Sequence, residues 1–243
     1  MSNLKFGVGL LMAALGCSPI TFAATPSAAT SPCSESEIMH ADWAGLTRYR
    51  DADSNVSTVD VVFMGDSITD LWTSPRSGGF FTGRNYLNRG ISGQTTPQML
   101  LRFRQDVIAL KPKAVVILAG TNDIAGNTGP MTNEEIEGNL ASMSELATAA
   151  HIKVILASIT PVGFDENNER IGGRPMERIK SINYWIRSYA AANGSLYLDY
   201  FSAMVGPHGL IKETLTDDGL HPNARGYAVM GPLAETAIAA ALR

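Results

Sequence analysis

The chain has 243 residues, of which 45% are hydrophobic and 17% charged, and its formal net charge is −4. This length is enough for one α/β core and leaves little room for a second domain. The chain is mildly acidic and has no block of Lys or Arg. We therefore do not expect nucleic acid or anionic membrane surfaces as partners.

The first 23 residues have the pattern of a secretory signal peptide. Lys5 provides a positive start, residues 6–15 form an apolar run, and residues 22–24 (Phe-Ala-Ala) offer small side chains for cleavage. The apolar run is too short for a comfortable membrane span. We therefore expect a secreted or periplasmic protein that is cleaved near Ala23 and has no membrane span.

Both cysteines lie near this segment. Cys17 ends the sequence Ala-Leu-Gly-Cys, a weak match to a lipoprotein cleavage box, so a lipid anchor at Cys17 is the less favoured alternative. Cleavage near Ala23 leaves Cys33 alone, and the mature chain then forms no internal disulfide. Residues 24–36 are rich in Ser, Thr, Ala and Pro and are expected to form a flexible lead-in to one folded domain over residues 37–243.

Strand-like and helix-like segments alternate through that domain. Short apolar or β-branched runs predict strands over residues 59–64, 85–89, 114–119, 153–158 and 196–199. Helical spacing and end signals predict helices over residues 97–110, 132–150, 175–192 and 223–242. This alternation predicts a three-layer α/β/α sandwich around a five-stranded parallel sheet.

Residues that could take part in a reaction follow the predicted strands. Ser67 comes after the first strand, Gly93 after the second and Asn122 after the third, while Asp218 and His221 lie in the long loop after the fifth. Because active sites of parallel sheets form beyond the carboxyl ends of the strands, we expect these residues to meet. A serine needs a base to take its proton and a third group to hold that base. Ser67, His221 and Asp218 therefore indicate acyl transfer, with ester hydrolysis as the expected reaction.

Four short blocks resemble the SGNH (GDSL-type) esterases and lipases. In the family's order, they are residues 65–67 (Gly-Asp-Ser), Gly93 within residues 90–96, residues 120–123 (Gly-Thr-Asn-Asp) and residues 218–221 (Asp-Gly-Leu-His). Each block alone is a weak signal, but the four in register are specific. Residues 88–103 also resemble, more loosely, the platelet-activating-factor acetylhydrolase-like branch, whose members favour short acyl groups.

The resemblance implies a flavodoxin-like SGNH hydrolase fold and a serine esterase without cofactor or metal. It implies that Ser67 attacks the ester carbonyl, that His221 moves the proton and that Asp218 orients His221. The oxyanion hole is implied to consist of the Ser67 and Gly93 backbone N–H groups and the Asn122 side-chain amide. The implied substrates are small-molecule, carbohydrate or lipid esters, with short acyl (acetyl) groups preferred over longer acyl chains, lysophospholipids or thioesters.

The same residues allow other interpretations. Ser67 could only cap the next helix, and Asp66 and Asp123 fit structural roles in their loops. An FMN-binding protein or a non-catalytic ligand-binding protein could share the fold. A metal-dependent hydrolase lacks the usual paired-His spacing but could use Asp66, Asp70, Asp123, Asp218 and His221.

Trp72 and His208 each have two interpretations. Trp72 follows Ser67 closely, so it either packs in the core, which we expect, or contacts the substrate. His208 lies near the late loop and is a rival base or a residue at the mouth of the site. We prefer His221 as the base because Asp218 accompanies it.

Overall fold

The computed structural model describes residues 42–74, 77–164 and 171–243. The predicted signal peptide with Cys17, and the predicted lead-in with Cys33, lie outside these residues. Within the described ranges, no helix combines the length and the apolar character needed to cross a membrane.

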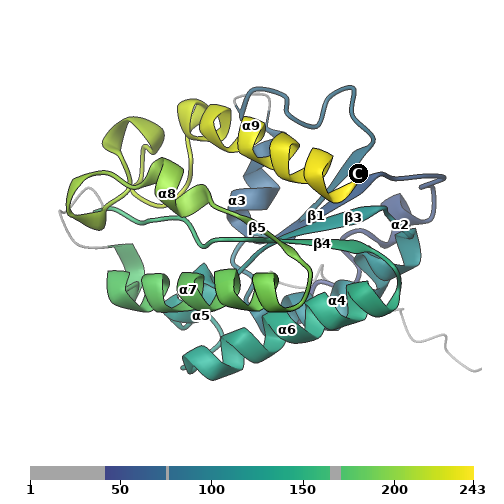
Figure 1. The fold of residues 1–243 in the computed structure, drawn as a ribbon, viewed down its shortest axis with the longest axis horizontal. Coiled ribbons are helices and arrows are strands. Elements are labelled where there is room, and N and C mark those ends of the chain that lie inside the picture. Colours follow the sequence, from purple (N-terminus) through teal and green to yellow (C-terminus); the bar gives the residue numbers. More distant parts are fainter. Residues whose placement is uncertain (1–41, 75–76, 165–170) are drawn as a thin grey trace, which may run out of the picture.

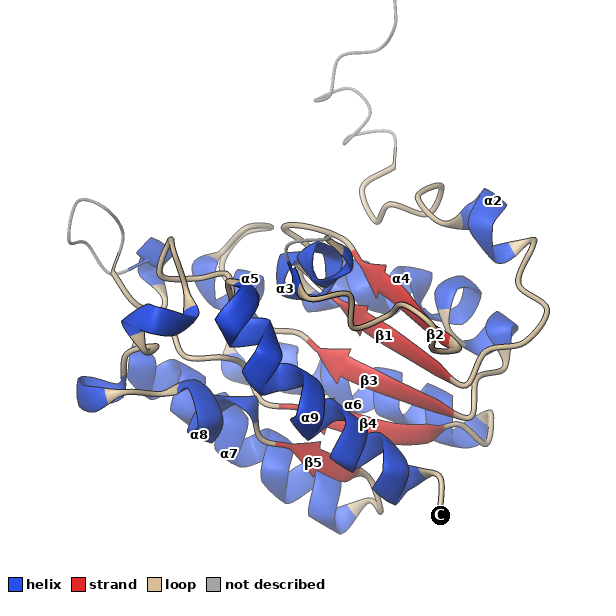
Figure 2. Cartoon of the chain, turned by 90° about the horizontal axis from the view of Figure 1, so that it is seen from above, coloured by secondary structure: helices blue, strands red, loops and turns tan. Residues whose placement is uncertain are grey.

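Five parallel strands form the sheet at the centre of the protein (Figures 1 and 2). They lie in the order β2-β1-β3-β4-β5, and this flavodoxin-like α/β fold agrees with the prediction. The strands are β1 (Val61–Gly65), β2 (Tyr86–Gly90), β3 (Ala114–Leu118), β4 (Lys153–Ala157) and β5 (Leu196–Leu198). Every residue of β1 and β3 is buried, which explains why their sequences are continuously apolar rather than alternating.

Helices cover both faces of the sheet and complete three layers (Figure 1). One face packs against α4 (Thr96–Asp106), α6 (Asn133–Ala149) and α7 (Met176–Ala192). The other face packs against α3 (Ser67–Asp70), α8 (Tyr200–Met204) and α9 (Ala224–Ala241). Two further short helices are α2 (Arg50–Asp53) and α5 (Thr121–Ala125).

The helix ends follow the signals in the sequence. Thr132 caps α6 through a capping box with Glu135, in which each side chain accepts the other residue's backbone N–H, at 3.2 and 2.7 Å. Asn223 caps α9.

The helix predicted over residues 97–110 is shorter than expected, because the chain leaves α-helical geometry at Val107 and continues as one 3₁₀ turn, Ile108–Leu110. The predicted helices did not include α2, α5 or α8, since helices of one turn are too short to show a period. A helix directly after Ser67 entered only as one that Ser67 could cap, and it is the one-turn α3.

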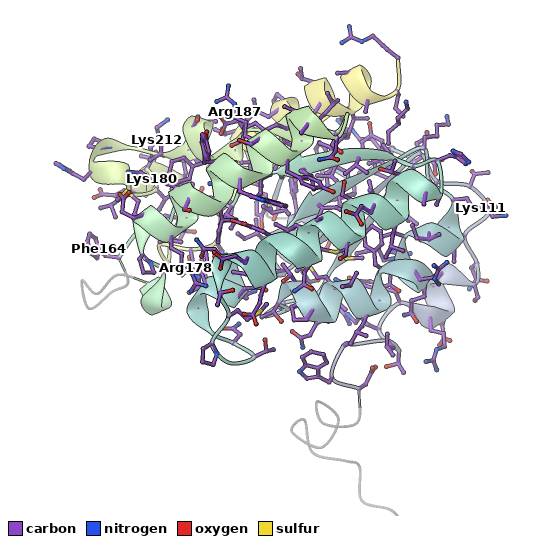
Figure 3. The ribbon with its side chains drawn as sticks, turned by 60° about the horizontal axis from the view of Figure 1, so that its bottom comes forward. Lys111, Phe164, Arg178, Lys180, Arg187 and Lys212 are labelled. Carbon is purple, nitrogen blue, oxygen red and sulfur yellow. The ribbon has the colours of Figure 1, made fainter. Side chains whose placement is uncertain are left out.

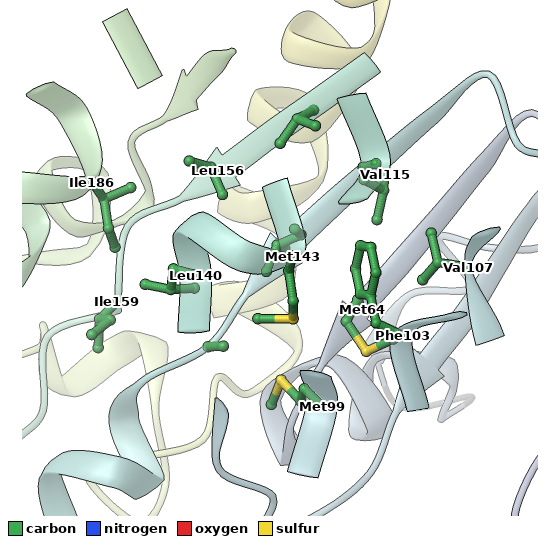
Figure 4. Close-up of a cluster of buried hydrophobic side chains, with 14 of the residues drawn as sticks. Met64, Met99, Phe103, Val107, Val115, Leu140, Met143, Leu156, Ile159 and Ile186 are labelled. Atoms are coloured by element: carbon green, nitrogen blue, oxygen red, sulfur yellow. The ribbon is translucent and has the colours of Figure 1, made fainter. Parts of the chain in front are cut away.

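Neighbouring strand residues point to opposite halves of the core. Met64 lies with Met99 and Phe103 of α4 on the side of α4, α6 and α7 (Figure 4). The preceding residue, Phe63, packs edge-to-face against Trp72 on the other side, with ring centroids 5.9 Å apart. Apolar contacts on both faces hold the strands rigidly, and with them the loops that leave their ends.

The strand order also determines where a site can form. The chain adds β2 on one side of β1 and then crosses to add β3 on the other side. The connections after β1 and β3 therefore leave the sheet toward opposite faces, and in folds of this kind ligands bind beyond the carboxyl ends of the strands at such a point. Ser67 and Asn122 lie directly beyond these two strands.

Candidate active site

Ser67 occupies the first turn of α3, immediately after β1. Asp66 is the N-cap of this helix, and its Oδ1 accepts a hydrogen bond of 2.9 Å from the Ile68 backbone N–H. The capping role that Ser67 could have had therefore belongs to Asp66. The Ser67 hydroxyl is directed to another partner.

That partner is His221. Its Nε2 lies 2.9 Å from Ser67 Oγ, and its Nδ1 lies 2.6 Å from Asp218 Oδ2. Asp218 Oδ1 accepts the backbone N–H groups of Leu220 and His221 at 2.9 and 2.7 Å. The structure thus brings together the serine, histidine and aspartate that the sequence singled out, in the line that proton transfer requires.

The electrostatics of this pair favour an ionised Asp218. Burial by itself raises the pKa of this carboxyl, but hydrogen bonds from the His221 ring and from two backbone N–H groups lower the pKa below its ordinary value. The Asp218 side chain is 54% exposed and that of His221 28%. Water therefore screens the pair, and the contribution of Asp218 to the site is smaller than that of a fully buried carboxylate.

Gly93 lies in the loop after β2, with a φ of +80°. This backbone conformation favours glycine, and among the described residues a Cβ at this position would meet only Asn127 Nδ2, at 4.0 Å. The positive φ, and not a lack of space for a side chain, therefore explains why position 93 is a glycine. Asn127 Nδ2 also donates a 3.1 Å hydrogen bond to the Gly93 carbonyl and so helps to fix the loop.

Asn122 is buried in α5, beyond β3. Its Nδ2 donates to the Gln94 carbonyl at 3.0 Å, and its Oδ1 accepts from Arg174 Nη2 at 3.1 Å. The three residues come from three separate segments: the loop after β2, the helix α5 and the segment before α7. We predicted neither Gln94 nor Arg174. Gln94 belongs to the second block, but only Gly93 was singled out there, whereas Arg174 belongs to no block, and no local spacing ties either residue to Asn122.

A second unpredicted group connects the loop of Gln94 to β1. Arg102 Nε donates to Gln94 Oε1 at 2.6 Å, and Arg102 Nη2 donates to the Gly65 carbonyl at 3.1 Å. Arg102 also pairs with Asp106 at 2.9 Å, and both side chains are fully buried. The sequence did contain a signal for this buried pair, which we did not use: an Arg and an Asp four residues apart on an apolar face of a predicted helix.

The two remaining acidic residues of the blocks have structural partners. Asp123 Oδ1 accepts the backbone N–H and the hydroxyl of Thr96 at 2.9 and 2.5 Å, so it caps α4, a helix that it does not precede in the sequence. Burial raises the pKa of Asp66 to about 6, against the opposing effect of its hydrogen bond from Ile68. Asp66 thus places a titratable carboxyl directly beside the serine.

Three other interpretations can be compared with the structure. Trp72 is only 1% exposed and stacks on Phe80 and Tyr227, with centroids 4.5 and 5.3 Å away, so it is a core residue. His208 lines a cavity of about 760 Å³ beside Gly219. The histidine that contacts Ser67 Oγ is His221, not His208. In the part of the chain that the structure describes, no three His, Cys, Asp or Glu side chains gather as a metal site would need.

Comparisons with known proteins agree with this fold. The chain is 27% identical to human platelet-activating factor acetylhydrolase IB subunit alpha1 over 195 residues, which cover 76% of this chain and 78% of the relative. It is 28% identical to an acetylxylan esterase of Geobacillus stearothermophilus over 200 residues, which cover 70% of this chain and 89% of that protein. A solved GDSL-like lipase from Bacteroides thetaiotaomicron is similar with a TM-score of 0.77 and 42% identity, over 82% of this chain and 100% of the other.

These relatives and the fold place the protein in the class of carboxylic ester hydrolases. A family model also matches residues 63–229, which is more than half of the chain. The chain therefore belongs to the GDSL-like lipase/acylhydrolase family.

Proposed function

We propose that the protein is a serine esterase that works through an acyl-enzyme. The proposal depends chiefly on one observation, the continuous line from Asp218 Oδ2 through the His221 ring to Ser67 Oγ, with contacts of 2.6 and 2.9 Å. Ser67 Oγ attacks the ester carbonyl carbon while His221 Nε2 takes the hydroxyl proton. When the tetrahedral intermediate collapses, the C–O bond breaks and His221 returns the proton to the leaving alcohol.

The second half of the reaction uses the same base. His221 takes a proton from water, the resulting nucleophile attacks the acyl carbon, and the proton returns to Ser67 Oγ as the acid leaves. Asp218 holds the ring through Nδ1 and offsets the positive charge that His221 carries at each step. The reaction consumes one ester and one water, and it gives one acid and one alcohol without a cofactor.

We assign the oxyanion hole to three donors from three loops: the Ser67 N–H, the Gly93 N–H and the Asn122 side-chain amide. The Ser67 N–H lies in the first turn of α3, where backbone N–H groups have no partner within the helix. One N–H of the Asn122 amide is occupied by Gln94, which leaves the second for the substrate oxygen. Loss of one such donor typically lowers the rate by about 100- to 1000-fold.

For the substrate, we propose short acyl esters, and acetyl esters above all. Two relatives whose names refer to acetyl groups, the human acetylhydrolase subunit and the Geobacillus acetylxylan esterase, cover most of this chain. Acetyl groups on a carbohydrate are the natural substrate class that we favour.

The test is turnover of p-nitrophenyl esters from acetyl to palmitoyl, with EDTA present, by the parent and by Ser67→Ala. Because the serine and its base act as a unit, we expect Ser67→Ala to lose roughly 10⁶-fold in kcat. Ser188→Ala is the matched control, since Ser188 is exposed on α7 and bonds only the Tyr184 carbonyl among the described residues. Equal turnover by parent and Ser67→Ala contradicts the mechanism, and a maximum at long chains contradicts the acyl preference.

We also propose that the protein is exported, to the periplasm or the medium, and cleaved near Ala23. The support is the composition of residues 1–24. N-terminal sequencing and the intact mass of exported protein test this. A start at Ala24 or Thr25 supports it, and a lipid-modified Cys17 at the new N-terminus contradicts it.

A further inference from the structure

We propose that Arg174 is a positioning residue of the oxyanion hole, which orients and polarises the Asn122 amide. This inference rests on the proposed function. Arg174 comes after β4, between the 3₁₀ turn Ile171–Gly173 and α7, and lies 52 positions from Asn122 in the sequence. No sequence block contains it.

The guanidinium lies in the interior, directly against α5. Arg174 is only 5% exposed. Its Nε donates to the Thr121 carbonyl and to Thr121 Oγ1, both at 3.0 Å, and its Nη2 donates to Asn122 Oδ1 at 3.1 Å. The planar fork therefore holds two consecutive residues of α5 at once, a geometry that Lys cannot reproduce.

These contacts determine which way the Asn122 amide faces. A guanidinium can only donate hydrogen bonds, so the Asn122 oxygen must face Arg174. The Gln94 carbonyl can only accept, so the Asn122 NH₂ group must face the loop after β2. Arg174 and Gln94 together fix the donor side of the amide toward the loop that carries Gly93.

The charge of Arg174 points to more than a packing role. No carboxylate oxygen of the described residues lies within 4.0 Å of its guanidinium, so the cation is buried without a direct ion-pair partner, and the Asp66 carboxyl attracts it only from a greater distance. Such burial is unfavourable. The charge-assisted hydrogen bond to Asn122 Oδ1 draws electron density from the amide, which makes its N–H groups stronger donors to a developing oxyanion.

The backbone beside Arg174 is shaped to admit the guanidinium. Gly172 has a φ of +48°, and a Cβ there would lie 2.4 Å from Arg174 Nη1. Any side chain at position 172 would therefore displace the guanidinium. The positive φ by itself favours glycine here, and the lack of a Cβ at position 172 also leaves room for the Arg174 guanidinium.

The experiment is a double-mutant cycle on p-nitrophenyl acetate hydrolysis, with Arg174→Gln, Asn122→Ala and the double variant. If Arg174 acts through Asn122, Arg174→Gln lowers kcat by roughly 10- to 100-fold and leaves KM nearly unchanged. In the Asn122→Ala background, the same change then has an effect of less than about threefold, because its target is absent.

Arg178→Gln is the matched control, since Arg178 lies near the start of α7 (Figure 3) and bonds Asn133 and Met131 instead of the site. We expect its kcat to match the parent. Circular dichroism and thermal melting check the fold of every variant. If Arg174→Gln does not fold, Arg174→Lys takes its place in the cycle, with a smaller loss expected because the charge remains.

Two outcomes overturn the inference: parent-like kcat in the Arg174 variant, or an equal fold loss with and without Asn122, which indicates a purely structural role. Both are distinguishable from failure of the proposed function. If the proposed function is wrong, Ser67→Ala retains the parent's turnover. The double-mutant cycle then has no serine-dependent activity to measure.

Discussion

His221 Nε2 lies 2.9 Å from Ser67 Oγ because the loop that carries the histidine is closed at its base. Thr216 and Pro222 form an antiparallel bridge, so that the intervening residues project as a short, pinned loop. The Asn223 N–H donates to the Leu215 carbonyl at 2.9 Å, and α9 begins immediately afterwards. The ring is therefore aimed at the serine by backbone bonds as well as by its bond to Asp218.

Asp218→Asn tests how much the orienting carboxylate contributes. We expect kcat/KM to fall by about 10²- to 10⁴-fold, less than in Ser67→Ala, because the amide favours the wrong ring tautomer while the remaining machinery is intact. The exposed position of Asp218 favours the lower end of this range. Asp217→Asn is the control, since Asp217 bonds Asn223 rather than His221. Equal losses in the two variants contradict the assignment of Asp218.

Gly93→Ala tests the loop after β2. At a φ of +80° a side chain is strained, so we expect stability to fall by about 1 to 2 kcal/mol. We also expect kcat/KM to fall by roughly 100-fold if relief of that strain moves the Gly93 N–H. Urea unfolding and kinetics measure the two effects. Gly138→Ala in α6 is the matched control: a Cβ there meets no atom within 4 Å in the part of the chain that the structure describes, and the variant should gain up to about 1 kcal/mol.

Asp66→Asn should change how stability depends on pH. The pKa of Asp66 is raised from 3.8 to about 6 in the folded protein, so its favourable contribution is complete below the unfolded value and is lost as the pH rises from about 4 to 6. Above that range the buried charge costs at most about 3 kcal/mol. Asn can keep the cap of α3 without the charge.

We therefore expect Asp66→Asn to be more stable than the parent near pH 8, with a smaller difference near pH 4.5. Urea unfolding of both proteins at each pH measures this difference. The same difference at both pH values would show that the Asp66 charge does not carry the effect.

Trp72 substitutions separate packing from substrate contact. Trp72→Ala should lower stability by about 3 to 5 kcal/mol, because it empties a volume between Phe80 and Tyr227. Trp72→Phe should cost less, since it keeps most of the ring and removes a buried indole N–H that has no hydrogen-bond partner among the described residues. Unfolding and KM are measured together. A KM that changes in Trp72→Phe while stability is unchanged contradicts the packing role.

The strands and the longer helices could be predicted from the sequence because their signals are local. The apolar runs at β1 and β3 and the Thr132–Glu135 capping box depend on neighbours within a few residues. Short helices such as α3 and α5 have no such period, and tertiary contacts help to hold them in place. The Tyr227 hydroxyl donates to the Ile68 carbonyl of α3 at 2.8 Å, and Arg174 donates to the Thr121 carbonyl of α5.

For the candidate site, the sequence determined which residues to consider and at which edge of the sheet they lie. The four blocks are short local motifs, and a parallel sheet brings the carboxyl ends of its strands together. The sequence already favoured His221 over His208 as the base and a Trp72 packed in the core. Only the tertiary structure decided how Asn122 is held, by Arg174 and by the Gln94 carbonyl. These contacts join residues far apart in the chain, and their geometry depends on how the layers pack around the sheet, which no local pattern encodes.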